Sequence, residues 1–186
     1  MTDDSDDSNE SPRRASDARF RQRRAELADA LRGLLGSRAA AEPLDDADRA
    51  AALAAEAGAA HRAGRRHAWA VVRRRWGGDE RAAVAALVHA VSAHVGSRPA
   101  WLILPGREPQ AVAVESDAVL DNPLGFAALA GGELVLLDQE VPAGVWLAGP
   151  AAGVGAWELE VWGAEPWLSA ATRALREQPA SDDAGG

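Results

Sequence analysis

Residues 79–104, with the sequence DERAAVAALVHAVSAHVGSRPAWLIL, decide the fold because their hydrophobic period changes halfway along the stretch. The first half carries a stripe of apolar residues at the spacing of one helical face. Acidic residues stand at its start and Gly96 follows its end, which is typical of a helix with favourable termini. After Pro99 the period becomes two, and Trp101 opens a short apolar run. The stretch therefore predicts a helix followed at once by a strand. The helical stripe consists of Val84, Leu87, Val88, Val91 and Val95.

The sequence after this stretch repeats short apolar runs that are separated by turn residues. Each run has the length of a strand, and the short spacing between runs indicates a meander. Pro166 then begins a final helix whose Leu168 and Leu175 can lie on the sheet. These patterns predict an α+β fold with a mostly antiparallel sheet of about five or six strands, a long central helix and a C-terminal helix packed on one face, and a helical N-terminal arm. The strands expected after Pro99 are residues 101–104, 111–114, 134–137, 145–148 and 157–162.

Residues 67–76 fit two interpretations. As a helix, the segment places Trp69, Val72 and Trp76 on one face at positions i, i+3 and i+7. As a strand, it places alternate residues on opposite faces. We favour the strand because glycines stand on both sides of the segment.

The chain divides into four segments by composition. Residues 1–16 are expected to be a disordered acidic tail, residues 17–63 a helical arm, residues 64–178 the α+β domain, and residues 179–186 a disordered tail. The arm carries a helical apolar stripe that must be buried, either on its own domain or on a second copy of the chain. The second choice predicts a homodimer through the N-terminal helix. The stripe consists of Phe20, Leu27, Leu31, Leu34 and Leu35.

The composition excludes several kinds of chemistry. Lys, Tyr and Cys are absent, so the 20 basic residues are all arginine. This excludes Schiff-base lysines, cysteine nucleophiles, thiolate metal sites, disulfides and the lysine of phosphate-binding loops. The chain has no long apolar stretch and starts with acidic residues, so we expect a cytoplasmic protein that does not enter a membrane and holds no cofactor.

Charge is unevenly distributed along the chain, whose net charge is −8. An arginine-rich segment without acids is followed by a long acidic segment, residues 108–165, without bases. The two segments either attract one another within the fold or between protomers, or one of them faces a partner of opposite charge. The arginines also define an alternative function, a nucleic-acid-associated protein in which they bind phosphate; the acidic character of the chain opposes it. They are Arg62, Arg65, Arg66, Arg73, Arg74 and Arg75.

Catalytic patterns in the sequence are weak. The histidines have the wrong spacing for a metal site, and arginines flank two of them. Ser97 lies near His94 in the sequence, but no nucleophile motif surrounds it. An acidic cluster follows the expected strand 111–114, and its carboxylates could do acid–base work or hold a hard cation, although a solvated loop is the simpler interpretation. A small hydrolase with a carboxylate or histidine site is therefore a further alternative. The cluster consists of Glu115, Asp117, Asp121 and Asn122.

The last expected strand supplies the main functional hypothesis. A period of two points Glu158, Glu160 and Trp162 to the face opposite the core, and Trp146 can join them from the preceding strand. Aromatic rings among carboxylates are typical of a recognition surface for a basic, partly apolar partner. We therefore expect a non-enzymatic protein-binding module, such as an adaptor, chaperone-like or immunity-like protein, whose partner is a protein with a basic surface. This hypothesis requires the two indoles to be accessible to water.

Overall fold

The computed structural model describes residues 7–36, 41, 43–66, 71–76, 81–105, 108–152 and 155–177. Within these residues the chain forms helices and one six-stranded antiparallel sheet, which confirms the α+β class. The helices are α1 (Asp7–Leu35), α2 (Ala47–Arg66), α3 (Arg81–Val95), α4 (Ser116–Leu120), α5 (Pro123–Leu129) and α6 (Trp167–Glu177), with a short 3-10 helix at Pro150–Ala152. The strands are β1 (Val71–Trp76), β2 (Pro99–Leu104), β3 (Gln110–Glu115), β4 (Glu133–Asp138), β5 (Ala143–Ala148) and β6 (Trp157–Gly163).

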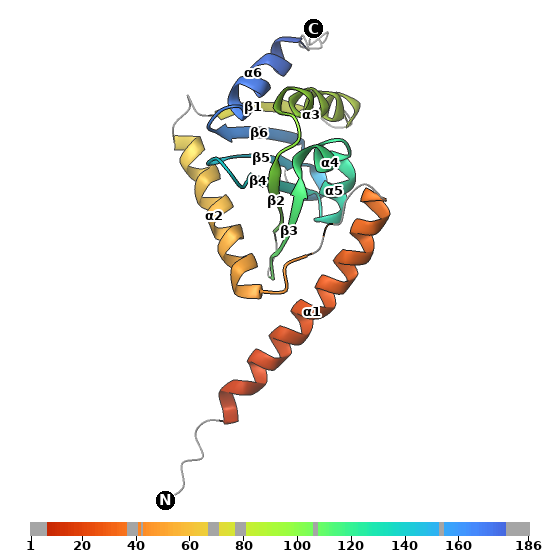
Figure 1. The fold of residues 1–186 in the computed structure, drawn as a ribbon, viewed down its shortest axis with the longest axis vertical. Helices are drawn as coiled ribbons and strands as arrows, with labels where there is room; N and C mark the ends of the chain where they lie inside the picture. Colours follow the sequence, from red (N-terminus) through yellow and green to blue (C-terminus); the bar gives the residue numbers. More distant parts are fainter. Residues whose placement is uncertain are drawn as a thin grey trace, which may run out of the picture.

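The sheet has the strand order β1-β6-β5-β4-β2-β3, and each strand is antiparallel to its neighbours (Figure 1). Residues 71–76 form the edge strand β1, so the strand interpretation is confirmed there and the helical one is wrong. Residues 67–70 lie outside the described part of the chain. The register of β1 and β6 places Arg73 opposite Glu160 and Arg75 opposite Glu158, and opposite charges in such cross-strand pairs favour the pairing.

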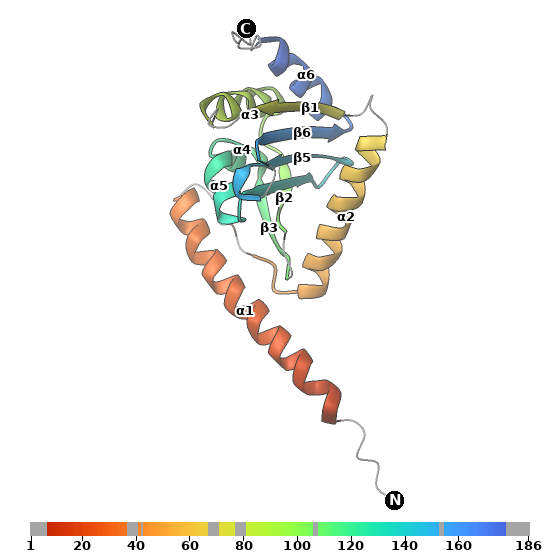
Figure 2. The ribbon, with the colours of Figure 1, turned by 180° about the vertical axis from the view of Figure 1, so that it is seen from behind.

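The two faces of the sheet are covered by different helices. Helices α3, α4, α5 and α6 pack on one face and enclose the larger hydrophobic core, to which α3 contributes Val84, Leu87, Val88 and Val91. Helix α2 covers the other face, as the two opposite views show (Figures 1 and 2). Ala50, Leu53 and Ala57 are its buried apolar residues, so its contact with the sheet is close but involves few large side chains.

Helix α1 begins at Asp7 and runs without a break to Leu35. The disordered tail expected up to residue 16 therefore differs from the structure over residues 7–16. A helix adds residues easily once its packed part has formed, and acidic residues near the N-terminus of α1 favour its dipole. The helix extends away from the sheet at its N-terminal end (Figure 1).

The apolar stripe of α1 packs on its own domain. Leu27, Leu31 and Leu35 belong to the larger core, whereas Phe20 joins the smaller core on the α2 side. Leu34 is half-buried against the larger core. This packing removes the reason to expect a second copy of the chain at the stripe, and homodimerisation stays an untested prediction.

A buried carboxylate ties the ends of three elements together. Asp138, the last residue of β4, accepts hydrogen bonds from Arg98 Nε at 2.5 Å and from Trp167 Nε1 at 2.7 Å. Its other oxygen accepts from the backbone N–H groups of Glu140 and Val141 at 2.7 and 3.0 Å. Burial alone would raise the pKa of Asp138, but these hydrogen bonds outweigh it and lower the pKa.

Among the described residues, no helix has the length and apolar character needed to cross a membrane.

Candidate functional site

The four residues predicted from the last strands do share one face of the sheet. Trp146 on β5 lies opposite Glu160 on β6, and Ala148 lies opposite Glu158. Trp162 belongs to the core on the α2 side, whereas its neighbours along β6, Trp157, Leu159 and Val161, belong to the other core. The period-two interpretation of β6 is therefore correct.

Helix α2 covers most of this face, which corrects the expected exposure. Trp162 is 2% exposed and Glu160 is completely buried, while Trp146 and Glu158 are half-buried. The ring of His61 on α2 stacks on Trp146 with centroids 5.0 Å apart and lies 5.4 Å from the ring of Trp162. The sequence missed this cover because an alanine-rich helix with one leucine shows little apolar pattern. His61 was the available signal, since an imidazole is a suitable partner for an inward-facing carboxylate.

The buried Glu160 has hydrogen-bonding partners from two elements, α2 and β1. His61 Nε2 contacts one of its carboxylate oxygens, and Arg73 Nε donates to the other at 2.5 Å. Next to it, Arg75 Nε lies 3.2 Å from Glu158. A buried carboxylate is tolerated only with such partners. These pairs show that the arginine-rich and acidic segments attract one another within the fold, at least where β1 meets β6.

The arginine patch proposed for nucleic acid does not form one surface in the described residues. Arg73 and Arg75 pair with glutamates on the α2 side of the sheet. Arg74 points to the other side, where its guanidinium carbon lies 5.9 Å from the centre of the Trp76 ring. Arg62 is exposed on α2, and the side chains of Arg65 and Arg66 lie outside the described part. The described arginines are thus divided between two faces.

The predicted acidic cluster lines a cavity of about 500 Å³. Strand β3 ends at Glu115, α4 follows at once, and the side chain of Asn122 caps α5 by accepting from Gly125 N at 3.2 Å. The hydroxyl of Ser116 donates to Gly96 O at 3.2 Å and accepts from Arg98 N at 3.1 Å, which fixes the loop after α3 beside the cluster. The lining residues are Leu34, Leu35, Ser97, Glu115, Asp117, Ala118, Asp121 and Asn122. We call this cavity the acidic pocket.

Among the described residues, the carboxylates of the acidic pocket lack an arginine partner. Ser97 Oγ lies 2.9 Å from a carboxylate oxygen of Glu115 and 2.9 Å from one of Asp117. A hydroxyl has one proton, so it donates to only one of the two at a time. Asp121 lies 3.5 Å from His89, whose side chain is 71% exposed. Within the described residues, no arginine forms an ion pair with any of the three carboxylates, in contrast to Asp138, Glu158 and Glu160.

The acidic pocket does not assemble a serine–histidine relay. The hydroxyl of Ser97 contacts carboxylates, and the imidazole of His89 contacts Asp121 instead of the serine. The Nε2 atom of His94, the histidine nearest to Ser97 in the sequence, donates to a carboxylate oxygen of Glu177 on α6 at 2.8 Å. In the part of the chain that the structure describes, no group of three or more histidines and acids is arranged to hold a metal ion.

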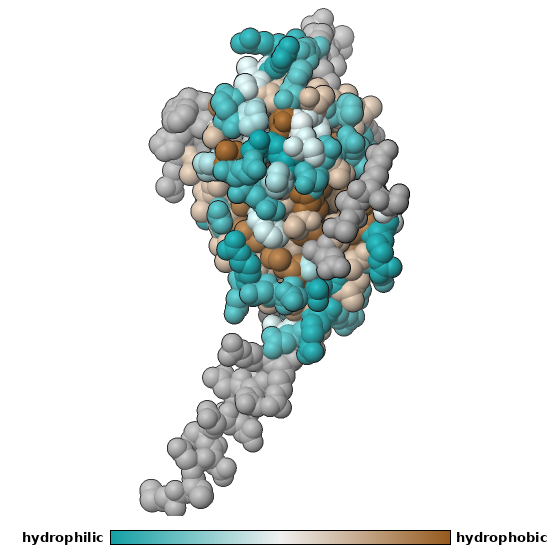
Figure 3. Space-filling model, in the orientation of Figure 1, coloured by the Kyte–Doolittle hydropathy of each residue, from teal (hydrophilic) through white to brown (hydrophobic). Residues whose placement is uncertain are grey.

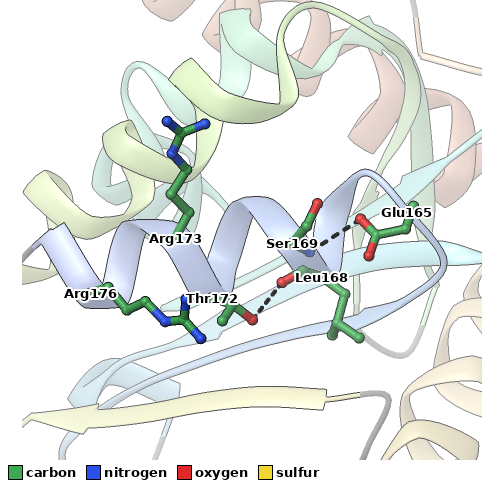
Figure 4. A pocket seen from close by; sticks show the side chains of 6 residues that line it. All are labelled: Glu165, Leu168, Ser169, Thr172, Arg173 and Arg176. Atoms are coloured by element: carbon green, nitrogen blue, oxygen red, sulfur yellow. Dashed lines mark hydrogen bonds between the residues drawn. The ribbon is translucent and has the colours of Figure 1, made fainter.

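A second hollow of about 390 Å³ lies along α6, and several of its polar groups are already engaged (Figure 4). Thr172 Oγ1 donates to Leu168 O at 2.8 Å, and Ser169 N donates to Glu165 at 3.3 Å. Figure 4 shows that Arg173 and Arg176 leave the helix in different directions, so they do not converge on one ligand. On the face seen in Figure 3, the hydrophobic areas are interrupted by hydrophilic residues.

The fold and the pocket together define an acidic α+β domain with one sheet face closed by an alanine-rich helix and a carboxylate-lined cavity at the end of α1. No protein-family model, curated protein or solved structure matches the chain.

Proposed function

We propose that the protein is a non-enzymatic protein-binding module that receives a basic, partly apolar segment of another protein in the acidic pocket. The observation that carries the proposal is the set of three carboxylates, Glu115, Asp117 and Asp121, which have no arginine partner among the described residues and line one cavity. An adaptor, a chaperone-like or an immunity-like protein would use such a site. The cytoplasm, expected from the sequence, is part of the proposal.

The chemistry of the pocket favours an arginine side chain next to an apolar residue. A guanidinium offers five N–H donors, which supply the donors that the single Ser97 hydroxyl cannot provide to two carboxylates. Leu34 and Leu35 form the apolar part of the lining, against which a neighbouring aliphatic side chain can pack. The site therefore combines charge recognition with a small apolar contact.

The tryptophan-bearing face does not carry this proposal. Glu160 and Trp162 lie beneath α2, so only Trp146 and Glu158 of the four residues reach the surface, and each of these two is half-buried. Trp146 also donates from its Nε1 to Glu133 at 2.7 Å. A partner that used this face would have to displace α2.

The test is the binding of a fluorescein-labelled heptapeptide in which two arginines flank a leucine, followed by fluorescence anisotropy. We expect saturable binding that the counterpart peptide with glutamates in place of arginines does not show. The variant with Glu115→Gln, Asp117→Asn and Asp121→Asn should bind about tenfold more weakly, because each rim ion pair contributes a fraction of a kcal/mol. The matched control carries Asp45→Asn, Asp48→Asn and Glu56→Gln, which make the same change in net charge at exposed positions on and beside α2.

The control variant should bind the arginine peptide like the unchanged protein. Equal weakening in both variants would mean that the peptide responds to net charge alone, and the proposal would be wrong. Absence of binding to the unchanged protein would also contradict it.

A small hydrolase at the same pocket is the second candidate, favoured by the contacts of Ser97 with two carboxylates and of Asp121 with His89. It ranks lower because the imidazole does not reach the serine. Hydrolysis of p-nitrophenyl acetate by the protein, abolished by Ser97→Ala, would reverse this order. We expect the unchanged protein and the Ser97→Ala variant to hydrolyse p-nitrophenyl acetate at the same rate.

A further inference from the structure

A third cavity, of about 340 Å³, lies between α1, the hairpin of β2 and β3, and the end of α5. Its apolar lining comes from Leu27 on α1, Leu104 and Pro105 at the end of β2, and Leu129 on α5. Nothing in the proposed function uses this cavity, which we call the hairpin cavity. It also contains the side chain of Gln110, the first residue of β3.

Gln110 is an unusual residue for this position. It points to the same side of β3 as Val112 and Val114, which belong to the larger core, and it lies opposite Leu104 on β2. Only 5% of its surface is exposed. Neither its amide oxygen nor its amide nitrogen has a hydrogen-bond partner among the described residues, and both atoms are sealed from solvent.

Both the donor and the acceptor of this amide lack a partner among the described residues and are available to a ligand. Leaving a buried donor or acceptor without a partner is destabilising, and Gln110 leaves both kinds unpaired among the described residues. The donor and the acceptor stand side by side, so their natural complement is the edge of another amide, whose carbonyl accepts and whose N–H donates. Among the described residues no hydrogen bond holds the side chain, and we expect rotation about its last dihedral angles to bring the buried amide into contact with a ligand in the cavity.

The surroundings select a neutral ligand with an apolar body. Glu108, at the edge of the cavity, lies 3.3 Å from Arg19 Nε and 4.0 Å from Arg23 Nη1, so charges of both signs compensate each other there. Glu26, the other acid in the lining, accepts a hydrogen bond from Gln22 at 2.9 Å. A cationic ligand would meet Glu26 as its only carboxylate without a cationic partner among the described residues, and this exposed side chain contributes little because water screens it.

We infer that the hairpin cavity binds a small neutral molecule with a cyclic-amide edge, such as a lactam, whose carbonyl accepts from Gln110 Nε2 and whose N–H donates to Gln110 Oε1. The ring carbons of the ligand pack on the leucines and Pro105. This site is distinct from the acidic pocket, so it stands or falls independently of the proposed function.

The test uses 2-piperidone as the probe, N-methyl-2-piperidone as the matched molecule without the N–H, and ¹H–¹⁵N NMR of the whole protein. We expect 2-piperidone to shift the side-chain amide signals of Gln110 in a saturable way, and the methylated molecule to bind about tenfold more weakly because one hydrogen bond is lost. The variant Gln110→Met keeps the size of the side chain and should lose the difference between the two molecules. It should also melt at least as high as the unchanged protein, since it removes an unpaired amide.

The control variant is Gln139→Met, which changes a glutamine outside the cavity whose amide donates to Ala100 O at 3.1 Å. It should keep the preference for 2-piperidone. Three results would overturn the inference: no saturable shift of the Gln110 amide, an equal response to both molecules, or an unchanged preference in Gln110→Met. Exchange of the Gln110 signals with water alone, without a response to 2-piperidone, would show that ordered water fills the site and would equally overturn it.

Discussion

Asp138 illustrates how a single residue stabilises this fold. Its folded-state pKa lies below the ordinary value of 3.8, because the hydrogen bonds from Arg98 and Trp167 outweigh the effect of burial. The same contact raises the pKa of Arg98, mainly through the hydrogen bond to Asp138. The bonds join the end of β4 to the residue before β2 and to the start of α6.

The pKa of Asp138 gives the first prediction. A carboxyl whose pKa is lowered by folding stabilises the protein fully above its unfolded pKa, about 3.8, and this stabilisation is lost as the pH falls through the lower folded value. Asp138→Asn should lower the free energy of unfolding at pH 7 by about 3 kcal/mol, because Arg98 and Trp167 lose a buried acceptor. Urea denaturation at several pH values from about 2 to about 7 checks this prediction. The difference between the two proteins should shrink at the acidic end; a constant difference would contradict the assignment.

Gly144 supplies the second prediction. A Cβ added there would lie 2.5 Å from Leu136 O and 2.6 Å from the ring of Trp162, which are impossible contacts without movement of the sheet or the indole. Gly144→Ala should therefore lower the free energy of unfolding by about 1–3 kcal/mol in chemical denaturation. Gly33→Ala in α1 is the matched control, since nothing lies within 4 Å of its added Cβ. That variant should be neutral or slightly stabilised, because alanine favours a helix.

Individual residues were predictable from the sequence only as far as the strand period reaches. The alternation along β6 correctly placed Glu158, Glu160 and Trp162 on one face. It could not tell which helix covers that face, because burial depends on long-range contacts. Gln110 had a recognisable signal that the sequence analysis did not use: a polar residue in register with Val112 and Val114 on the core side of a strand.

At the scale of elements, α2 decides whether the tryptophan-bearing face of the sheet is accessible to a partner. Its residues His61 and Leu53, together with alanines, pack on the tryptophan-bearing face of the sheet and shield most of that face from solvent. Trp162→Ala should therefore lower the free energy of unfolding by about 3–5 kcal/mol, the range for large buried aromatic residues. Trp146→Ala should cost less because Trp146 is only half-buried. Urea denaturation followed by circular dichroism checks both; equal and small effects would mean that α2 does not close this face in solution.

The elements themselves differ in how well the sequence predicts them. The central helix carries valines and leucines at one helical spacing, and the structure describes it as α3 from Arg81 to Val95. The strands from β2 to β6 also follow the apolar runs. The early start of α1 and the position of α2 were not predictable, since charged and alanine-rich helices depend on packing and propagation more than on an apolar stripe.

At the scale of the whole molecule, charge pairing decides which acids are available to a partner. Glu158 and Glu160 are paired with β1, and Asp138 and Glu140 are paired with Arg98. Among the described residues, no arginine pairs with the carboxylates of the acidic pocket. The sequence showed the separation of charge along the chain, but the pairing of its two segments depends on the strand order β1-β6, which no local pattern contains.

This distribution predicts a strong effect of salt on partner binding. Binding of the arginine peptide should weaken as the ionic strength rises from about 0.05 to about 0.5 M, because exposed charges are screened over a Debye length of about 10 Å at 0.1 M. The free energy of unfolding should change much less over this range, since the carboxylates of Glu160 and Asp138 are themselves buried. Anisotropy and urea denaturation in the same buffers compare the two. Salt-independent peptide binding would contradict a role for the carboxylates.

The most direct test of the acidic pocket is a selection from a random peptide library on three immobilised proteins: the unchanged chain, the Glu115→Gln, Asp117→Asn, Asp121→Asn variant, and the matched variant at Asp45, Asp48 and Glu56. The selection assumes no partner sequence. We predict that the unchanged and matched proteins enrich peptides with an arginine beside an apolar residue, and that the pocket variant does not. The same enrichment on all three proteins would contradict the account.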